Sequence, residues 1–362
     1  MAAKACSAPA ARRASATSGR QFVARREPAA QGVRYGAVIA AILCFAAGGA
    51  RAACSGHDLF PLIEEKAPEA FAAIKAQAAE TPFGRGTFFR LSRGDDAPSY
   101  LFGTLHLADP RVTDFRPSVV AALDASKTLA VESVETGARL ESVIRKDPKA
   151  MRAAVLADAA ERARTLLDRA DFAALKALVA AAGMKASAAG ELKPAVLALL
   201  LDLPACARTN GARPYADQRI AAMARARGLK VVGLETMIEQ LDSLDGLPPD
   251  ESRALLVSTL RQASEAEDVV ETTIARYVEQ DTGALLAWMR SPDFIPGVVG
   301  AATPTLFLDR LISGRNQRMA ARALPLLAGG GVFIAVGATH LPGKEGLLRL
   351  FEEQGFAVER VE

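Results

Sequence analysis

The sequence predicts an α/β fold in which helices cover a central β-sheet. Three observations support this prediction: short β-rich runs recur along the chain, long Ala- and Leu-rich helical segments separate them, and half of the 362 residues are hydrophobic. Strands that alternate with helices are typical of a sheet with helices packed against it. The expected strands are 87–92, 99–103, 128–132, 230–234, 332–337 and 356–361, most of them continuous apolar runs of the buried-strand type.

The segments between these strands are predicted to be mainly helical. Residues 58–80 carry apolar side chains at three-to-four-residue spacing, which predicts a helix that Pro68 kinks or splits. The turn-rich sequence RGDDAP between the first two strands predicts a hairpin. Residues 139–213 show no strand pattern, and a proline pair opens another helical run over 249–290. We expect both to be helical insertions that form a cap over the sheet, within a single domain spanning residues 53–362.

Residues 1–52 have the properties of a targeting leader. They carry a charge surplus of +7 and an apolar run over residues 35–50, which ends in the small-x-small sequence Ala-Arg-Ala. This pattern predicts a signal peptide cut near Ala52/Ala53, and hence an exported protein, periplasmic or secreted, that touches a membrane only through the leader before cleavage. An uncleaved anchor is the weaker alternative, because the run is shorter than the roughly 20 apolar residues that span a bilayer.

The rest of the chain is acidic. The whole sequence carries a formal charge of +3, so the residues after the leader sum to −4, and the chain holds only four Tyr and one Trp. A nucleic-acid interface needs basic patches with interleaved aromatic residues, and none is found here. We therefore expect no nucleic-acid partner, and a peptide or small-molecule substrate instead.

The cysteines agree with export. Only Cys54 and Cys206 remain after the leader, an even number that suits one disulfide in an oxidising compartment. Two separate thiols are equally compatible with the sequence.

Two of the three histidines lie in matching contexts, and this repeated motif is the most informative feature of the sequence. His106 and His340 each lie in a G-x-x-H-L motif that comes at the end of a hydrophobic strand. Glycine permits a tight exit from the strand, and the carboxyl edge of an open α/β sheet is where ligands bind. Because neutral histidine is the commonest metal ligand, two such imidazoles are able to share an ion. His57 is expected to be an exposed terminal residue.

Candidate third donors and supporting groups come from similar positions. Glu132 ends one predicted strand, Glu235 directly follows another, and Arg315 precedes the strand that leads to His340. A metal site with a spare carboxylate as proton acceptor suffices for hydrolysis, and a guanidinium is suited to clamp a carboxylate or stabilise an oxyanion. The structural alternatives are that the two glutamates cap helices and that Arg315 and Asn316 anchor a helix.

Four segments resemble the TraB/GumN family, which includes the TIKI proteins. They are YLFGTLHLAD at 100–109, AVE at 130–132, and the stretches 214–241 and 315–361. The paired G-x-x-H motifs, with GLET and RN between them, make the resemblance specific. It implies a fold of the erythromycin esterase/ChaN type, a central mixed β-sheet wrapped by helices.

The resemblance also implies a metal-dependent hydrolase, because TIKI members are regarded as peptidases that use a divalent ion such as manganese or cobalt. By position it points to His106, His340 and Glu132 as metal or catalytic residues, with Glu235 as base or second ligand and Arg315 as substrate-orienting or oxyanion-stabilising group. Manganese, iron, cobalt and zinc all suit this donor set. Two alternatives stay open: an envelope protein that binds a ligand in the same cleft without turnover, and a biogenesis factor with a vestigial site.

Overall fold

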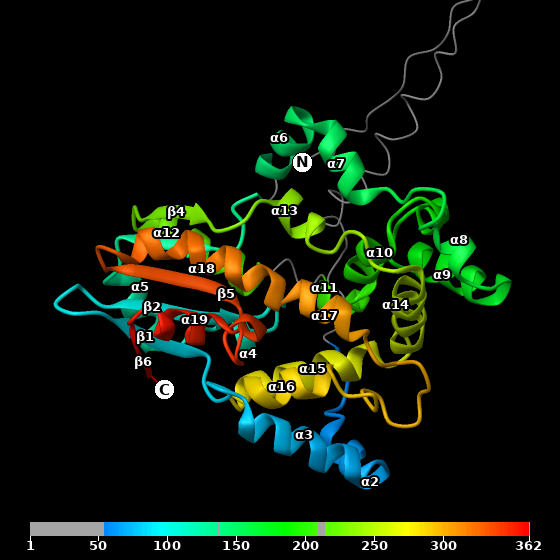
Figure 1. The fold of residues 1–362 in the computed structure, drawn as a ribbon, viewed down its shortest axis with the longest axis horizontal. Helices are drawn as coiled ribbons and strands as arrows, with labels where there is room; N and C mark the ends of the chain where they lie inside the picture. Colours follow the sequence, from blue (N-terminus) through cyan, green and yellow to red (C-terminus); the bar gives the residue numbers. More distant parts are fainter. Residues whose placement is uncertain (1–53, 136–137, 209–213, 362) are drawn as a thin grey trace, which may run out of the picture.

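The structure, a computed structural model, describes residues 54–135, 138–208 and 214–361 (Figure 1). The expected signal peptide over residues 1–52 and the expected new N-terminus at Ala53 lie outside these described residues. In the described part of the chain, no helix has both the length and the apolar character needed to cross a membrane.

A six-stranded mixed sheet forms the centre of the fold and confirms the predicted α/β class. The strands are β1 (Phe88–Ser92), β2 (Ser99–Thr104), β3 (Thr128–Val131), β4 (Lys230–Gly233), β5 (Val332–Gly337) and β6 (Ala357–Arg360). Their spatial order is β4-β3-β5-β2-β1-β6. β1 and β2 form the predicted antiparallel hairpin, and β4, β3, β5 and β2 run parallel to one another. Each strand matches a predicted run to within one residue at either end.

Helices cover both faces of this sheet, which gives three layers (Figure 1). The covering helices are α18 (Ser313–Leu327) and α19 (Leu347–Glu353) on one face, and α5 (Pro117–Asp124) and α12 (Ala216–Ala226) on the other. Alternate side chains of β5 point to opposite layers: Ile334 packs on the first pair of helices and Phe333 on the second. A strand buried on both faces has to be apolar throughout, which explains the continuous apolar run of β5.

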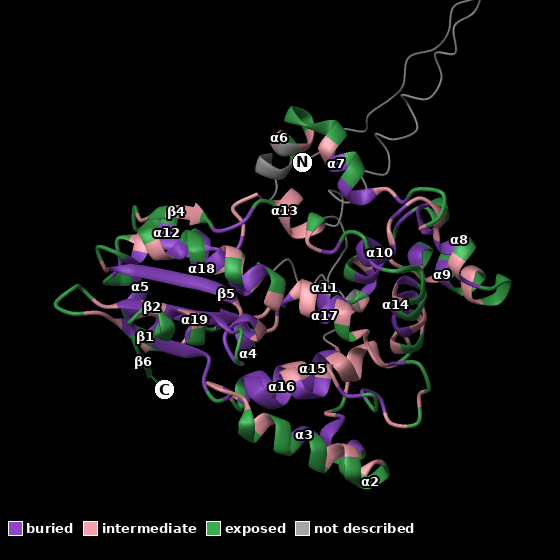
Figure 2. Ribbon diagram, in the orientation of Figure 1, coloured by how far each residue is buried: buried purple, intermediate pink, exposed green. Residues whose placement is uncertain are grey.

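The two edge strands differ from the buried type that the sequence predicted. β4 and β6 are partly exposed along their length, whereas β5 is buried at all but its last residue (Figure 2). These two strands are more exposed because they lie at the two edges of the sheet, where a strand has a paired neighbour on one side only. Position in the sheet is set by the order of the strands and not by the residues of one strand.

The predicted helix over residues 58–80 is two helices, as the proline suggested. These are α2 (Phe60–Lys66) and α3 (Pro68–Glu80), which are separated at Ala67. Pro68 occupies the first position of α3, where its missing N–H would have no intrahelical partner. Both helices pack around the fully buried Trp288.

Helices also occupy the two ranges in which the sequence shows no strand pattern. The first range holds α6 (Ala138–Lys146), α7 (Pro148–Val155), α8 (Ala163–Leu166), α9 (Arg169–Ala181), η1 (Ala186–Gly190), α10 (Pro194–Leu201) and α11 (Ala205–Arg208). The second holds α14 (Pro249–Gln262), α15 (Ala266–Val278) and α16 (Thr282–Met289). The remaining helices are α4 (Pro110–Thr113), α13 (Met237–Asp242), α17 (Thr305–Leu311) and η2 (Ala338–His340). Residues 209–213 of the first range lie outside the described residues.

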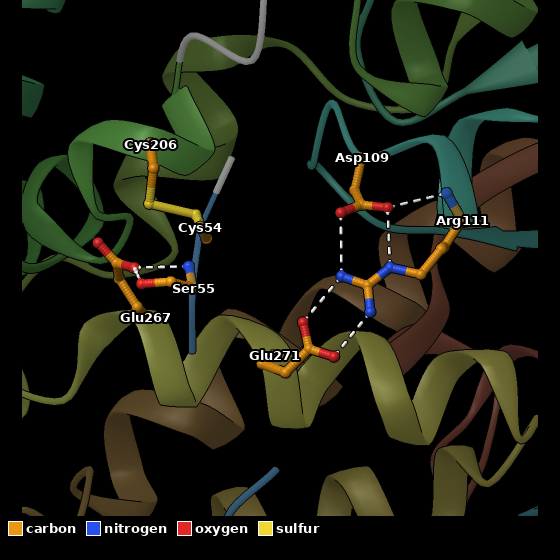
Figure 3. Close-up of a disulfide and its surroundings, with 7 residues drawn as sticks. All are labelled: Cys54, Ser55, Asp109, Arg111, Cys206, Glu267 and Glu271. Carbon is orange, nitrogen blue, oxygen red and sulfur yellow. Dashed lines mark hydrogen bonds and ion pairs between the residues drawn. A yellow bond between two sulfur atoms is a disulfide. The ribbon is translucent and has the colours of Figure 1, made fainter. Parts of the chain in front are cut away.

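A disulfide joins Cys54 to Cys206, with the two Cα atoms 5.2 Å apart (Figure 3). The sequence left this pairing open, and the structure decides for the bridge. The adjoining N-terminal segment is fastened to α15 as well: the backbone N–H and the hydroxyl of Ser55 both donate to Glu267. The start of the described chain is thus tied to two helices, α11 and α15.

Candidate active site

Four of the predicted site residues follow the carboxyl ends of four adjacent parallel strands. Across this edge they lie in the order Glu235 after β4, Glu132 after β3, His340 after β5 and His106 after β2. The chain continues from β5 to α19 on one face of the sheet, whereas β2 and β3 lead to α5 and α12 on the other face. Open α/β sheets bind ligands in the crevice at such a reversal.

Glu132 is a buried carboxylate with both oxygens engaged. Its Oε1 accepts the N–H of Gly337 at 2.7 Å, and its Oε2 accepts from the Arg315 guanidinium at 2.5 Å. Burial by itself favours the protonated acid, but His340, Arg315 and this backbone N–H favour the carboxylate and hold the pKa of Glu132 well below its usual range. Glu132 is therefore negatively charged at neutral pH.

His340 is buried beside Glu132, with its Nε2 3.7 Å from Oε1 of that carboxylate. Its Nδ1 lies 2.7 Å from Oδ1 of Asn316, whose amide nitrogen donates to the backbone oxygen of Glu345. Because that donation fixes Oδ1 as the acceptor, the His340 proton sits on Nδ1 and the lone pair on Nε2. Burial lowers the pKa of His340 to about 4, so the ring is neutral at pH 7.

His106 lies on the loop after β2, and its side chain is 60% exposed. Its Nδ1 is 2.8 Å from Oδ2 of Asp217, and the other oxygen of that carboxylate accepts the hydroxyl of Thr104. The charge of Asp217 raises the pKa of His106 to about 10 against the opposing effect of desolvation. Solvent screens part of this attraction because the imidazole is exposed.

Arg315 and Glu235 form a buried ion pair behind the site. The Arg315 guanidinium donates to Glu235 at 2.8 Å, to Glu132 at 2.5 Å and to the backbone oxygen of Leu311, and Arg318 occupies the remaining oxygen of Glu235. Burial lowers the pKa of Arg315, but the two carboxylates outweigh it and raise the pKa above its usual value. Both side chains are therefore engaged with protein partners, and Arg315 is placed to fix the orientation of Glu132.

Two residues of this constellation were missed or underrated from sequence. Asp217, in the first turn of α12, fixes the ring of His106, and Asn316 fixes that of His340 instead of only anchoring a helix. Neither has a spacing signal relative to its histidine, because the contacts join residues 111 and 24 positions apart. The sequence did offer one indication of their importance: both residues lie in stretches that resemble the TraB/GumN family, Asp217 in 214–241 and Asn316 in 315–361.

The glycines of the two G-x-x-H motifs allow close packing where β2 and β5 end. Neither adopts the left-handed backbone region. A Cβ on Gly103 would come within 2.9 Å of the Cα of Ala338, and one on Gly337 within 3.2 Å of the carboxylate of Glu132. Both positions need glycine so that the neighbouring strand exit and the carboxylate are able to approach closely.

The profile of the TraB/PrgY/gumN family matches residues 87–360. The chain belongs to the TraB/PrgY/gumN family. This confirms the resemblance drawn from the motifs, and the matched range contains all five predicted site residues. Searches among curated proteins and among solved structures give no match.

In this TraB/PrgY/gumN chain the site contains residue types that commonly bind divalent ions, two histidines and a carboxylate. Asp217 and Asn316 each hold Nδ1 of one histidine, so that Nε2 is the ring nitrogen left for a ligand, and a carboxylate lies next to His340. Histidines that ligate metals nearly always have the other ring nitrogen bonded in this way. Within the described residues, however, no group of three His, Cys, Asp or Glu side chains is gathered closely enough to hold an ion.

We expect acid to destabilise this protein, when no metal is bound, because of the lowered pKa of His340. Because folding lowers its pKa from 6.5 to about 4, His340 contributes stability that is present above pH 6.5 and lost as the pH falls toward 4. At roughly 1.4 kcal/mol per pKa unit, the loss across this window is roughly 3 kcal/mol of unfolding free energy. Urea denaturation at a series of pH values measures it.

The matched controls are the substitutions His340→Asn and His57→Asn. The loss of unfolding free energy assigned to His340 between pH 6.5 and 4 should be absent from His340→Asn. It should persist in His57→Asn, because the ring of His57 is 90% exposed. His106 adds no slope here, since its raised pKa places its own loss of stability at alkaline pH. An unchanged pH slope in His340→Asn would contradict the burial argument.

Proposed function

We propose that this protein is an exported, metal-dependent hydrolase that acts on a peptide or a similar amide. The observation that carries the proposal is the pair of oriented histidines: Asp217 and Asn316 leave Nε2 of His106 and of His340 for a ligand at the carboxyl edge of the sheet. The buried Glu132 carboxylate supplies the negative charge that a cation requires. The disulfide supports export, because such bonds persist in oxidising compartments.

The residues have distinct parts in this proposal. His106, His340 and Glu132 would hold the ion, which supplies a water of lowered pKa and polarises the scissile carbonyl when it is bound. Arg315 keeps Glu132 ionised and oriented, and Glu235 balances the charge of Arg315. His106 has to release its proton before it binds a metal, so we expect metal affinity to rise with pH.

The test is the metal content of the purified protein and of the double variant His106→Ala, His340→Ala, measured by elemental analysis. We expect close to one equivalent of manganese, cobalt or zinc in the parent, none in the folded double variant, and amide hydrolysis only by the loaded parent. His57→Ala is the matched control and should keep the metal, because His57 lies at the exposed start of the described chain. Absence of metal from the parent after reloading with all three ions would overturn the proposal.

A second candidate is a binding protein without turnover, and one observation favours it. A cavity of about 370 Å³ lies directly against His106 and Thr339. In that case a ligand raises the melting temperature of the protein, and no product is released. Product analysis after incubation with the loaded protein separates the two candidates.

A further inference from the structure

The cavity beside His106 has apolar walls supplied by five helices. Side chains of α10, α14, α15, α16 and α17 surround it, among them Leu255, Val270, Trp288 and Phe307. Residues of the loop after β2, His106 among them, and Thr339 also line it. Its volume of about 370 Å³ falls within the range of roughly 300–1,000 Å³ that is typical of small-molecule sites.

Most of the polar side chains in these walls donate their hydrogen bonds to the protein backbone. The hydroxyls of Ser258 and Thr259 donate to the backbone oxygen of Leu255, and that of Thr273 donates to the backbone oxygen of Val269. Gln262 and Trp288 likewise donate to backbone oxygens of the protein. The walls therefore offer apolar contact and few hydrogen bonds to a ligand.

Two of the polar lining residues, His106 and Thr339, belong to the loops that carry the candidate active site. Both line the cavity next to the carboxyl edge of the sheet, and Asp202, the other ionisable residue among the described lining residues, is exposed. A peptide backbone inserted into the walls would leave its N–H and C=O groups without partners, which costs free energy. A hydrocarbon chain has no such groups, and its polar head would lie at His106.

We propose that this cavity binds the acyl chain of an acylated substrate, with the acyl carbonyl at the His106 end. The assignment of the carbonyl as the reacting group rests on the proposed hydrolase function, whereas chain binding does not. In that reaction the oxygen of water bonds to the acyl carbon, the bond from that carbon to the amine nitrogen or alcohol oxygen breaks, and the leaving group takes a proton from the water. The products are a fatty acid and the free amine or alcohol.

The experiment measures the binding of cis-parinaric acid, a fluorescent fatty acid, to the purified protein without added metal. We expect saturable binding that dodecanoate displaces and acetate does not, because only the longer chain fills the apolar walls. Ala266→Phe places a ring in the cavity and should weaken binding about tenfold or more. If Ala266→Phe fails to fold, Ala263→Leu replaces it in this test, because it is a smaller change at another residue that lines the cavity.

The matched control is Ala72→Phe, which adds the same ring at an exposed position of α3 and should bind as the parent does. Equal displacement by acetate and dodecanoate, or unchanged binding in both folded cavity variants, overturns the proposal. The readout needs no turnover, so fatty-acid binding by a protein that contains no metal would leave the cavity assignment in place while the hydrolase proposal fails.

Discussion

Replacing Arg315 with alanine is expected to lower the free energy of unfolding by about 3–5 kcal/mol. The substitution removes the shared partner of two buried carboxylates, Glu132 and Glu235, and the side chains of both are almost inaccessible to solvent. A carboxylate that loses its cation inside a protein keeps the cost of desolvation without the compensating attraction. Glu235 retains Arg318, so the larger effect should come from Glu132. Urea denaturation at neutral pH measures the change.

Two further variants separate this charge effect from lost packing. Adding Glu132→Gln to Arg315→Ala should recover part of the stability, because it removes the unpaired charge while keeping the shape of the side chain. Arg145→Ala removes an exposed ion pair with Glu141 on α6 and should change the denaturation midpoint little. A double variant that is no more stable than Arg315→Ala would show that the charge of Glu132 is not the cause.

Removing the disulfide should have an effect of similar size. The bridge closes a loop with a sequence separation of 152 residues, and restricting so long a loop in the unfolded chain is worth about 4–5 kcal/mol in the chain-entropy account. We therefore expect Cys54→Ala, Cys206→Ala to unfold at clearly lower urea concentrations than the parent. The lost tether also frees the segment that Ser55 and His57 fasten to α15.

Reductant provides the control for this prediction. Under reducing conditions the parent should unfold close to the midpoint of the double variant, and the midpoint of the double variant should not respond to reductant. Equal stability of parent and variant without reductant would contradict the contribution assigned to the bridge.

The strands were predictable because each one depends on its own residues. All six runs were recognised, including the edge strands, and the split at Pro68 followed from the fixed backbone and missing N–H of proline. The exposure of β4 and β6 was not predictable in the same way. A half-exposed edge strand and a fully buried strand are able to carry similar short apolar sequences, and the difference lies in their neighbours.

By itself, the sequence determined the α/β class, the family and the strand ends that carry His106, Glu132, Glu235 and His340. These features follow from local patterns, since periodicity, glycine and proline act within a few residues.

Only the tertiary structure decided which of these residues meet. Along the chain His106 and Glu132 follow consecutive strands, β2 and β3, yet β5 inserts between these strands and places His340 beside Glu132. The tertiary structure also forms the ion pair of Glu235 with Arg315, the hydrogen bond of Asp217 with His106 and the disulfide of Cys54 with Cys206. Strand order and long-range contacts depend on how whole layers pack, and no spacing within a single sequence records them.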